Sequence, residues 1–245
     1  MGAAGKAHRH AMRLSIRLVC LLLAALLPAN PVRADDLGAA VARINNSAGA
    51  FCSGILLTRR IALTAAHCVF NPRVNRWLPA EAIHVLLGFD RGAYAFHTVA
   101  TAYRTDPLYD PSRPIETLAR DWALLELKTK APPTIALPQL ADEPAAGEAL
   151  MSLGFARDRP YRLGRSDACA RLPRAPLGLI ATDCRAPHGF SGGPLTARTT
   201  GALVGITVAG EETGRSGLAV PVSAWRAVLD EMSRLARTSE DLRRP

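Results

Sequence analysis

Ten short apolar runs, each bounded by turn residues such as Gly, Pro, Asn, Asp or Arg, follow one another through the sequence. Runs of this length and spacing are typical of β-strands. The runs cover residues 41–44, 51–57, 61–64, 82–89, 94–103, 122–127, 149–155, 178–182, 203–208 and 218–220. No helical pattern of ten residues separates them, which argues against alternating strands and helices. The sequence therefore predicts an all-β chain folded as an antiparallel sandwich or barrel.

One helix is predicted at the end of the folded part, over residues 223–237. Its apolar residues recur at helical spacing, and Ser223 is a suitable N-cap. The stripe they form consists of Trp225, Val228, Leu229, Met232 and Leu235, and we expect it to pack on the core. Residues 238–245 follow as a polar tail. Residues 103–121 and 154–176 are predicted as long loops, and the six arginines of the second are predicted to lie on a solvated surface.

The first 34 residues have the pattern of a secretory signal. A basic segment leads into ten uncharged residues, 18–27, and Val32 and Ala34 place small side chains before a cleavage point at Asp35. Ten apolar residues are about half of the length that spans a bilayer, so no stable membrane anchor is expected. We expect an exported protein, periplasmic or extracellular after cleavage near Ala34.

The high net charge of +9 comes partly from this signal. Residues 1–34 hold five of the 30 basic residues and no acidic one, which leaves 25 basic against 21 acidic residues, or +4, on the rest. Half of the residues (49%) are apolar, as in a globular domain. A nucleic-acid partner is therefore not expected.

Four cysteines remain after the signal, and export favours disulfides between them. Three pairings are open. Proximity in the sequence favours Cys52 with Cys68 and Cys169 with Cys184, each closing a loop worth about 3 kcal/mol. The alternative is a zinc site of Cys52, Cys68 and His67, but C-x-x-C spacing is missing and adjacent ligands suit a tetrahedral ion poorly. No metal or cofactor is expected.

Three segments carry residue types suited to nucleophilic catalysis. His67 ends the run LTAAH, Asp121 opens DWALLEL, and Ser191 lies in the glycine-rich turn GFSGGP. A serine hydroxyl is a weak nucleophile until an imidazole takes its proton, and a buried carboxylate fixes the imidazole tautomer. Together the three segments supply the parts of acyl transfer.

These segments resemble the motifs of the chymotrypsin/trypsin-like serine peptidases: TAAHC (64–68), DWALLEL (121–127) and GFSGGPL (189–195). The segment LVGITVAG (203–210) resembles the strand that lines the substrate cleft in that family. The resemblance implies two antiparallel six-stranded β-barrels followed by a C-terminal α-helix. The peptidase domain would cover residues 35–237, with barrel one at about 38–131 and barrel two at about 148–221.

The resemblance also implies roles for individual residues. Ser191 would be the nucleophile, His67 the general base and Asp121 the orienting carboxylate. The N–H groups of Gly189 and Ser191 would form the oxyanion hole, and Cys52 would be bridged to Cys68. The expected activity is that of a monomeric serine endopeptidase acting on protein or peptide substrates.

Four further residues are expected around the substrate pocket. Arg185, six residues before Ser191, would stand where an aspartate selects Lys or Arg in trypsin-like enzymes. Such a cation favours cleavage after Asp or Glu, unless the loop runs differently and points Arg185 to solvent. Gly210 and Gly217 would line the pocket walls, and Ala209 would replace a bulky tryptophan.

Two other functional classes fit part of the sequence. The segment around Ser191 also fits G-x-S-x-G of α/β-hydrolase esterases, but those enzymes need a histidine after the serine and none follows here. A catalytically silent binding protein on the peptidase fold is the remaining alternative, although such proteins usually lack a triad residue.

Activation is expected to need no second cleavage. Trypsin-like zymogens pair a new N-terminal ammonium with an aspartate before the nucleophile, whereas Phe190 stands there in this chain. The bond between Arg43 and Ile44 has the residues of an activation site, yet it lies in a predicted strand. We expect Phe190 to be held by apolar packing and the oxyanion hole to be preformed.

Overall fold

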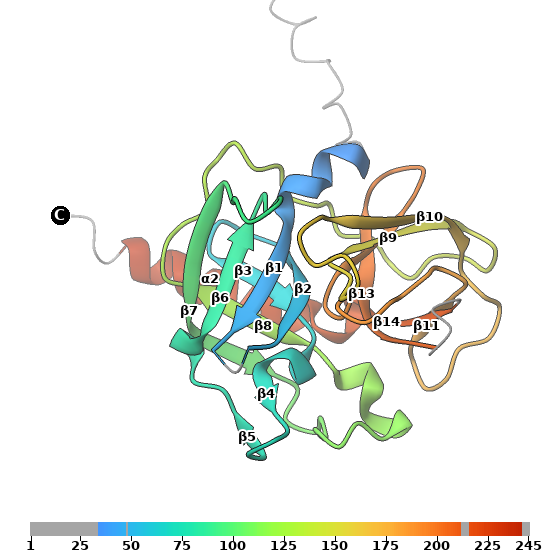
Figure 1. Ribbon diagram of the computed structural model, residues 1–245, viewed down its shortest axis with the longest axis horizontal. Coiled ribbons are helices and arrows are strands. Elements are labelled where there is room, and N and C mark those ends of the chain that lie inside the picture. The colour runs from blue at the N-terminus through green and yellow to red at the C-terminus, as the bar shows by residue number, and fades with distance from the viewer. Residues whose placement is uncertain (1–33, 48, 212–215, 242–245) are drawn as a thin grey trace, which may run out of the picture. The chain divides into compact units, whose positions relative to one another are not determined.

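The computed structural model of the protein describes residues 34–47, 49–211 and 216–241, and Figure 1 shows them as a coloured ribbon. The strands are β1 (Val41–Asn46), β2 (Phe51–Leu56), β3 (Ile61–Thr64), β4 (Phe70–Asn71), β5 (Arg76–Trp77), β6 (Ile83–Leu87), β7 (Phe96–Thr105), β8 (Ala123–Leu127), β9 (Ala149–Gly154), β10 (Gly164–Ala170), β11 (Ile180–Thr182), β12 (Pro194–Ala197), β13 (Leu203–Gly210) and β14 (Gly217–Pro221). The helical elements among these residues are the 3₁₀ helices η1 (Ala34–Ala40), η2 (Ala66–Val69), η3 (Ala80–Ala82), η4 (Ile115–Arg120) and η5 (Val222–Ala224) and the α-helix α2 (Arg226–Asp241). None of these helices is long and apolar enough to cross a membrane.

The first six long strands form a closed antiparallel barrel in the order β1-β2-β3-β8-β7-β6. Its centre is filled by branched aliphatic side chains such as Ile55, Leu63 and Leu124, all wholly buried. The pairing of β3 with β8 places Thr64 opposite Ala123. The chain that leaves β3 and the chain that enters β8 therefore lie side by side at one end of the barrel.

The later strands form a second six-stranded antiparallel sheet in the order β10-β9-β12-β13-β14-β11. This sheet is curled, and its strands lie beside the first barrel in Figure 1. The predicted mostly-β fold with a C-terminal helix is confirmed. The second barrel differs from the prediction in one respect: no continuous ladder joins the edge strands β10 and β11, and a single bridge, Arg171 with Thr182, connects the two edges.

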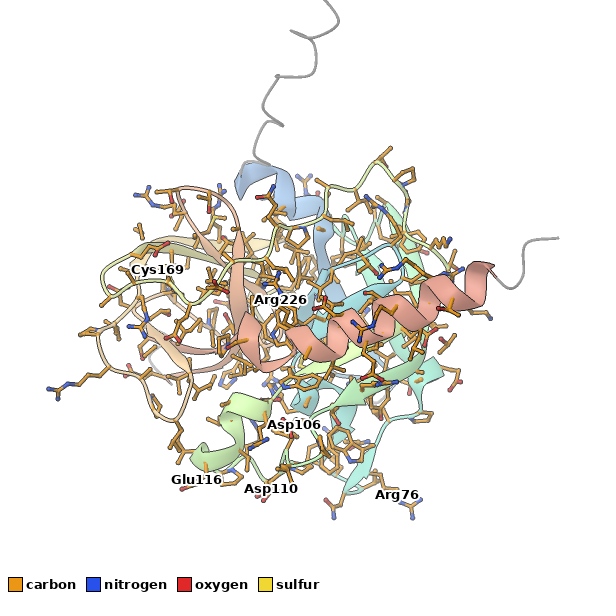
Figure 2. The ribbon with its side chains drawn as sticks, turned by 180° about the vertical axis from the view of Figure 1, so that it is seen from behind. Arg76, Asp106, Asp110, Glu116, Cys169 and Arg226 are labelled. Carbon is orange, nitrogen blue, oxygen red and sulfur yellow. A yellow bond between two sulfur atoms is a disulfide. The ribbon has the colours of Figure 1, made fainter. Side chains whose placement is uncertain are left out.

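A disulfide joins the two edges of this second sheet. Cys169 of β10, labelled in Figure 2, is bonded to Cys184 just beyond β11. Next to it, the backbone N–H of Leu172 donates to the carbonyl of Ala181 at 2.8 Å. Both sulfurs are buried. The pairing predicted from proximity is correct, and the disulfide reinforces the few backbone hydrogen bonds that join these two edges.

Replacing Cys169 and Cys184 together with alanine is expected to lower the free energy of unfolding by about 3 kcal/mol, the loop-closure value for 15 residues. Urea unfolding followed by tryptophan fluorescence measures this change. An unchanged unfolding midpoint would mean that the backbone contacts hold these two edges together without the disulfide.

Four strands were not predicted from the sequence: the two-residue strands β4 and β5, and the longer strands β10 and β12. Residues 154–176 were predicted as a loop but contain β10, which is a largely exposed edge strand with polar residues, so it lacks an apolar run. The four-residue strand β12 begins with Pro194 directly after the serine turn. The Gly and Pro residues there are typical of a turn, so the segment was not predicted as a strand. Strand β10 is fixed by its pairing with β9, the strand before it, whereas β12 pairs with β9 across a longer stretch of sequence, Leu195 opposite Ser152.

The predicted N-cap Ser223 is wrong, because α2 begins at Arg226. Ser223 lies in η5, and the wholly buried Trp225 follows with a backbone that interrupts the helix. Leu229 and Met232 are buried as predicted, whereas Leu235 is 55% exposed. The helix follows the second sheet in sequence but runs across the back of the first barrel from Arg226 (Figure 2).

The predicted signal falls outside the described residues except for Ala34, which opens η1. The bond between Arg43 and Ile44 lies in the middle of β1, paired on one side with β2 and on the other with β6. Cleavage there would cut a central strand of a closed barrel. This position supports the expectation that activation does not use that bond.

Candidate active site

His67 and Asp121 meet at the barrel end where β3 and β8 lie side by side. His67 follows β3 by three residues, in η2, and Asp121 precedes β8 by two. The small, wholly buried residues Ala65 and Ala66 let the η2 turn pack closely against the barrel. Cys68, the next residue, is bonded to Cys52 of β2, so the turn is fixed on both sides of His67.

The Asp121 carboxylate is completely buried and makes two contacts with His67. Oδ2 lies 2.7 Å from Nδ1 of the imidazole, and Oδ1 accepts a hydrogen bond of 2.9 Å from the His67 backbone N–H. A carboxylate can only accept, so Nδ1 carries a proton, and in the neutral imidazole Nε2 then presents its lone pair. The His67 ring remains 19% exposed, and it can therefore take a proton from a group outside.

Two further residues surround Asp121, and neither was predicted. The Arg113 guanidinium lies 3.7 Å from Oδ2 and donates a hydrogen bond of 2.8 Å to the carbonyl of Val208 on β13. Burial and the charge of Asp121 raise the pKa of the Tyr109 hydroxyl. Both residues belong to the segment predicted as a long loop, where no local pattern distinguishes them. Arg113 links the first barrel's carboxylate to the second sheet.

Ser191 lies in a turn that requires glycine at two positions, one before and one after the serine. Gly189 has φ +98°, and a Cβ there would collide with the carbonyl oxygen of Phe155. Gly192 has φ +79°, and a Cβ there would collide with the carbonyl oxygen of Ser53. The turn is therefore packed directly against strand β2 of the first barrel, and this contact brings Ser191 to the barrel end that carries His67.

The backbone N–H groups of Gly189 and Ser191 donate to no acceptor within the part of the chain that the structure describes. The carbonyl of Ser191, in contrast, accepts a hydrogen bond of 2.8 Å from the N–H of Ser53. No hydrogen bond joins the Ser191 hydroxyl to the described residues, including His67. Such contacts are often long in substrate-free enzymes and tighten when substrate binds.

Phe190 is buried, with 4% of its surface exposed. Its ring fits against two glycines of the second sheet: a Cβ at Gly154 would lie 2.8 Å from Cγ, and one at Gly164 would lie 3.1 Å from Cζ. This environment agrees with the apolar packing expected for Phe190.

A cavity of about 490 Å³ opens beside Ser191. Among the predicted pocket residues, Arg185, Ala209 and Gly210 line it. Gly217 does not line the cavity. It pairs with Gly210 on the neighbouring strand, and a Cβ at Gly217 would lie 3.0 Å from the Cβ of Ala186. Arg185 lines the cavity while remaining exposed to solvent. The other lining residues are Arg113, Arg157, Asp158, Ala186, Pro187, His188, Thr207, Val208 and Glu211.

The side chains of the alternative zinc site, Cys52, His67 and Cys68, lie within 4.8 Å of one another. The two sulfurs are bonded to each other, so neither is a thiolate that could bind a metal ion. This donor set does not fit zinc.

Residues 52–206 match the family described as the trypsin-like peptidase domain. The chain belongs to this family. The matched residues of this trypsin-like domain include His67, Asp121 and Ser191. No curated protein matches the chain.

The solved structures support the same fold for this trypsin-like domain. A structure of a Glu endopeptidase in complex with MPD is similar over 84% of this chain and 94% of its own chain, with a TM-score of 0.64 and 17% sequence identity. At this identity the similarity establishes a shared fold. A trypsin-like peptidase fold supports a serine protease in general terms.

Proposed function

We propose that the chain is a serine endopeptidase in which Ser191, His67 and Asp121 act as the catalytic triad. The observation that carries this proposal is the buried Asp121 carboxylate, which lies 2.7 Å from Nδ1 of His67 and accepts from the His67 backbone N–H, at the barrel end where the Ser191 turn packs. Nε2 is then the base for the Ser191 hydroxyl. The N–H groups of Gly189 and Ser191, which have no acceptor among the residues that the structure describes, are suited to bind an oxyanion.

In the proposed reaction, Ser191 Oγ attacks the peptide carbonyl carbon while its proton passes to Nε2 of His67. The N–H groups of Gly189 and Ser191 stabilise the oxyanion of the tetrahedral intermediate. Collapse of the intermediate breaks the C–N bond, and His67 returns the proton to the leaving amine. A water molecule, deprotonated by His67, then hydrolyses the acyl-enzyme and restores the Ser191 hydroxyl.

Export is part of the proposal. Two disulfides among the described residues are typical of proteins that fold in an oxidising compartment. Together with the signal pattern of residues 1–34, they support a periplasmic or extracellular peptidase whose mature chain begins at Asp35. Its partners would be protein or peptide substrates.

Covalent labelling tests the activity against the silent binding protein. Phenylmethylsulfonyl fluoride should modify the folded enzyme at Ser191, located by peptide mass spectrometry, because only a serine beside a base and an oxyanion hole reacts readily. Urea-unfolded protein is the control and should stay unmodified. A folded protein that also stays unmodified at Ser191 would favour the binding protein.

A preference for cleavage after Asp or Glu follows from the charges at the cavity. Arg113, Arg157 and Arg185 line it, against the two acids Asp158 and Glu211. A substrate carboxylate could bind a guanidinium in two parallel hydrogen bonds. The protein of similar fold is called a Glu endopeptidase, which agrees with this proposal.

Replacing Arg185 with Glu is expected to lower the ratio of kcat/KM for Glu over Gln peptides by about 10-fold or more, equivalent to about 1.4 kcal/mol. Matched fluorogenic peptides differing only at the residue before the cleaved bond measure this ratio. The control is Arg174→Glu, an exposed arginine of the same region that does not line the cavity. Cleavage by the parent enzyme only after Lys or Arg would contradict the acidic preference.

A further inference from the structure

Ser53 of β2 connects the first barrel to both sides of the Ser191 turn. Its backbone N–H donates to the carbonyl of Ser191 at 2.8 Å, and its hydroxyl donates to the carbonyl of Gly189 at 2.7 Å. Ser53 is wholly buried. One residue of the first barrel thus holds the two carbonyl groups that flank Phe190.

The direction of the Ser53 hydroxyl proton is fixed by a third contact. The N–H of Phe155 donates to Ser53 Oγ at 2.8 Å. Because that N–H can only donate, Oγ is the acceptor there and its own proton must point at Gly189. The Ser53 hydroxyl therefore donates its proton to the Gly189 carbonyl, and we call this hydrogen bond the Ser53 clamp.

The Ser53 clamp acts on a residue, Gly189, whose own backbone preferences do not fix its conformation. Gly189 has no side chain, and glycine adopts many backbone conformations at little cost. Phe190 next to it has no charge with which to anchor the turn. The Gly189 carbonyl shares its peptide group with the Phe190 N–H, so the hydrogen bond from Ser53 fixes the peptide plane that joins the two residues beside the oxyanion hole. The N–H groups of Gly189 and Ser191 themselves have no acceptor among the described residues.

We propose that Ser53 is a positioning residue that keeps the oxyanion hole formed in the absence of substrate. It acts through Gly189 and Ser191 and does not touch the reacting atoms. This inference rests on the proposed peptidase activity and adds the device that would make a second activating cleavage unnecessary.

Replacing Ser53 with alanine removes the hydroxyl but keeps the backbone N–H that holds Ser191. We expect kcat to fall about 10-fold to 100-fold with KM changed less than about 2-fold, since displaced donors lose interactions with the transition state rather than with the substrate. The affinity for a peptidyl boronic acid, whose serine adduct places an oxygen in the hole, should fall by the same factor as kcat/KM.

Two further variants separate positioning from a general loss of stability. Thr98→Val removes another buried hydroxyl, one that accepts from the Thr129 N–H at 3.1 Å in the first barrel, and should leave kcat within about 2-fold. If Ser53→Ala fails to fold, Ser53→Gly is measured in its place, because it also keeps the backbone bond to Ser191.

The outcomes distinguish this inference from the proposed function. A parent enzyme that reacts with sulfonyl fluoride, together with a Ser53 variant of unchanged kcat and boronic-acid affinity, would overturn the role of Ser53 alone. A parent enzyme without activity or labelling would overturn the peptidase itself. A parallel loss of kcat and boronic-acid affinity at constant Tm would support the Ser53 clamp.

Discussion

The Ser191→Ala variant is expected to lose at least about 10⁴-fold in kcat while folding normally. Without Oγ no acyl-enzyme can form, and only binding and the oxyanion hole remain to accelerate attack by water. Those terms alone leave about 10³-fold to 10⁴-fold over the uncatalysed reaction. The backbone of the turn is unaffected, because Ser191 is held through its carbonyl by Ser53.

Hydrolysis of a fluorogenic peptide, measured at saturating substrate, gives the loss in kcat. Thermal unfolding is the control: the Ser191 hydroxyl forms no hydrogen bond with the described residues, so Tm should match that of the parent. A variant that still cleaves within about 10-fold of the parent rate would show that another residue is the nucleophile.

Asp121→Asn is expected to lower kcat by about 10⁴-fold through the tautomer of His67. The His67 backbone N–H can only donate, so the amide oxygen of Asn stays on it, in the place of Oδ1. The amide NH₂ then faces Nδ1, which must accept instead of donate. The imidazole proton moves to Nε2, where it blocks acceptance of the Ser191 proton.

Asp106→Asn is the matched control for this change. Asp106 precedes the same segment and pairs with Arg120 at 3.0 Å, so the variant also loses a carboxylate and an ion pair. Its kcat should stay within about 2-fold of the parent. If Asp121→Asn reduced kcat no more than Asp106→Asn, Asp121 would have no specific role in orienting His67.

The sequence located His67, Asp121 and Ser191 because each lies in a local motif next to a strand end. The contact between His67 and Asp121 follows from the pairing of β3 with β8, two strands that are also visible as apolar runs. β10 could not be found in this way, because an exposed edge strand needs no apolar run and is specified by its partner β9.

Arg113 and Ser53 were missed for a related reason. Ser53 lies within a predicted strand, where a small polar residue has no distinguishing pattern, and its partner Gly189 is 136 residues away. In the sequence Arg113 is one of several charged residues in a predicted loop. Its contacts with Asp121 and the Val208 carbonyl exist only in the folded chain. Residues that connect the barrel to the second sheet therefore cannot be recognised from the local sequence of either partner.

The Cys52–Cys68 disulfide has its two ends next to the residues that matter most at this site. Cys52 precedes Ser53, which holds the Ser191 turn, and Cys68 follows His67. A chain with reduced cysteines would lack the cross-link between these two neighbours. Under the export proposed above, this cross-link would form only in the oxidising compartment, so the proposed site would be completed after the chain leaves the cell that makes it.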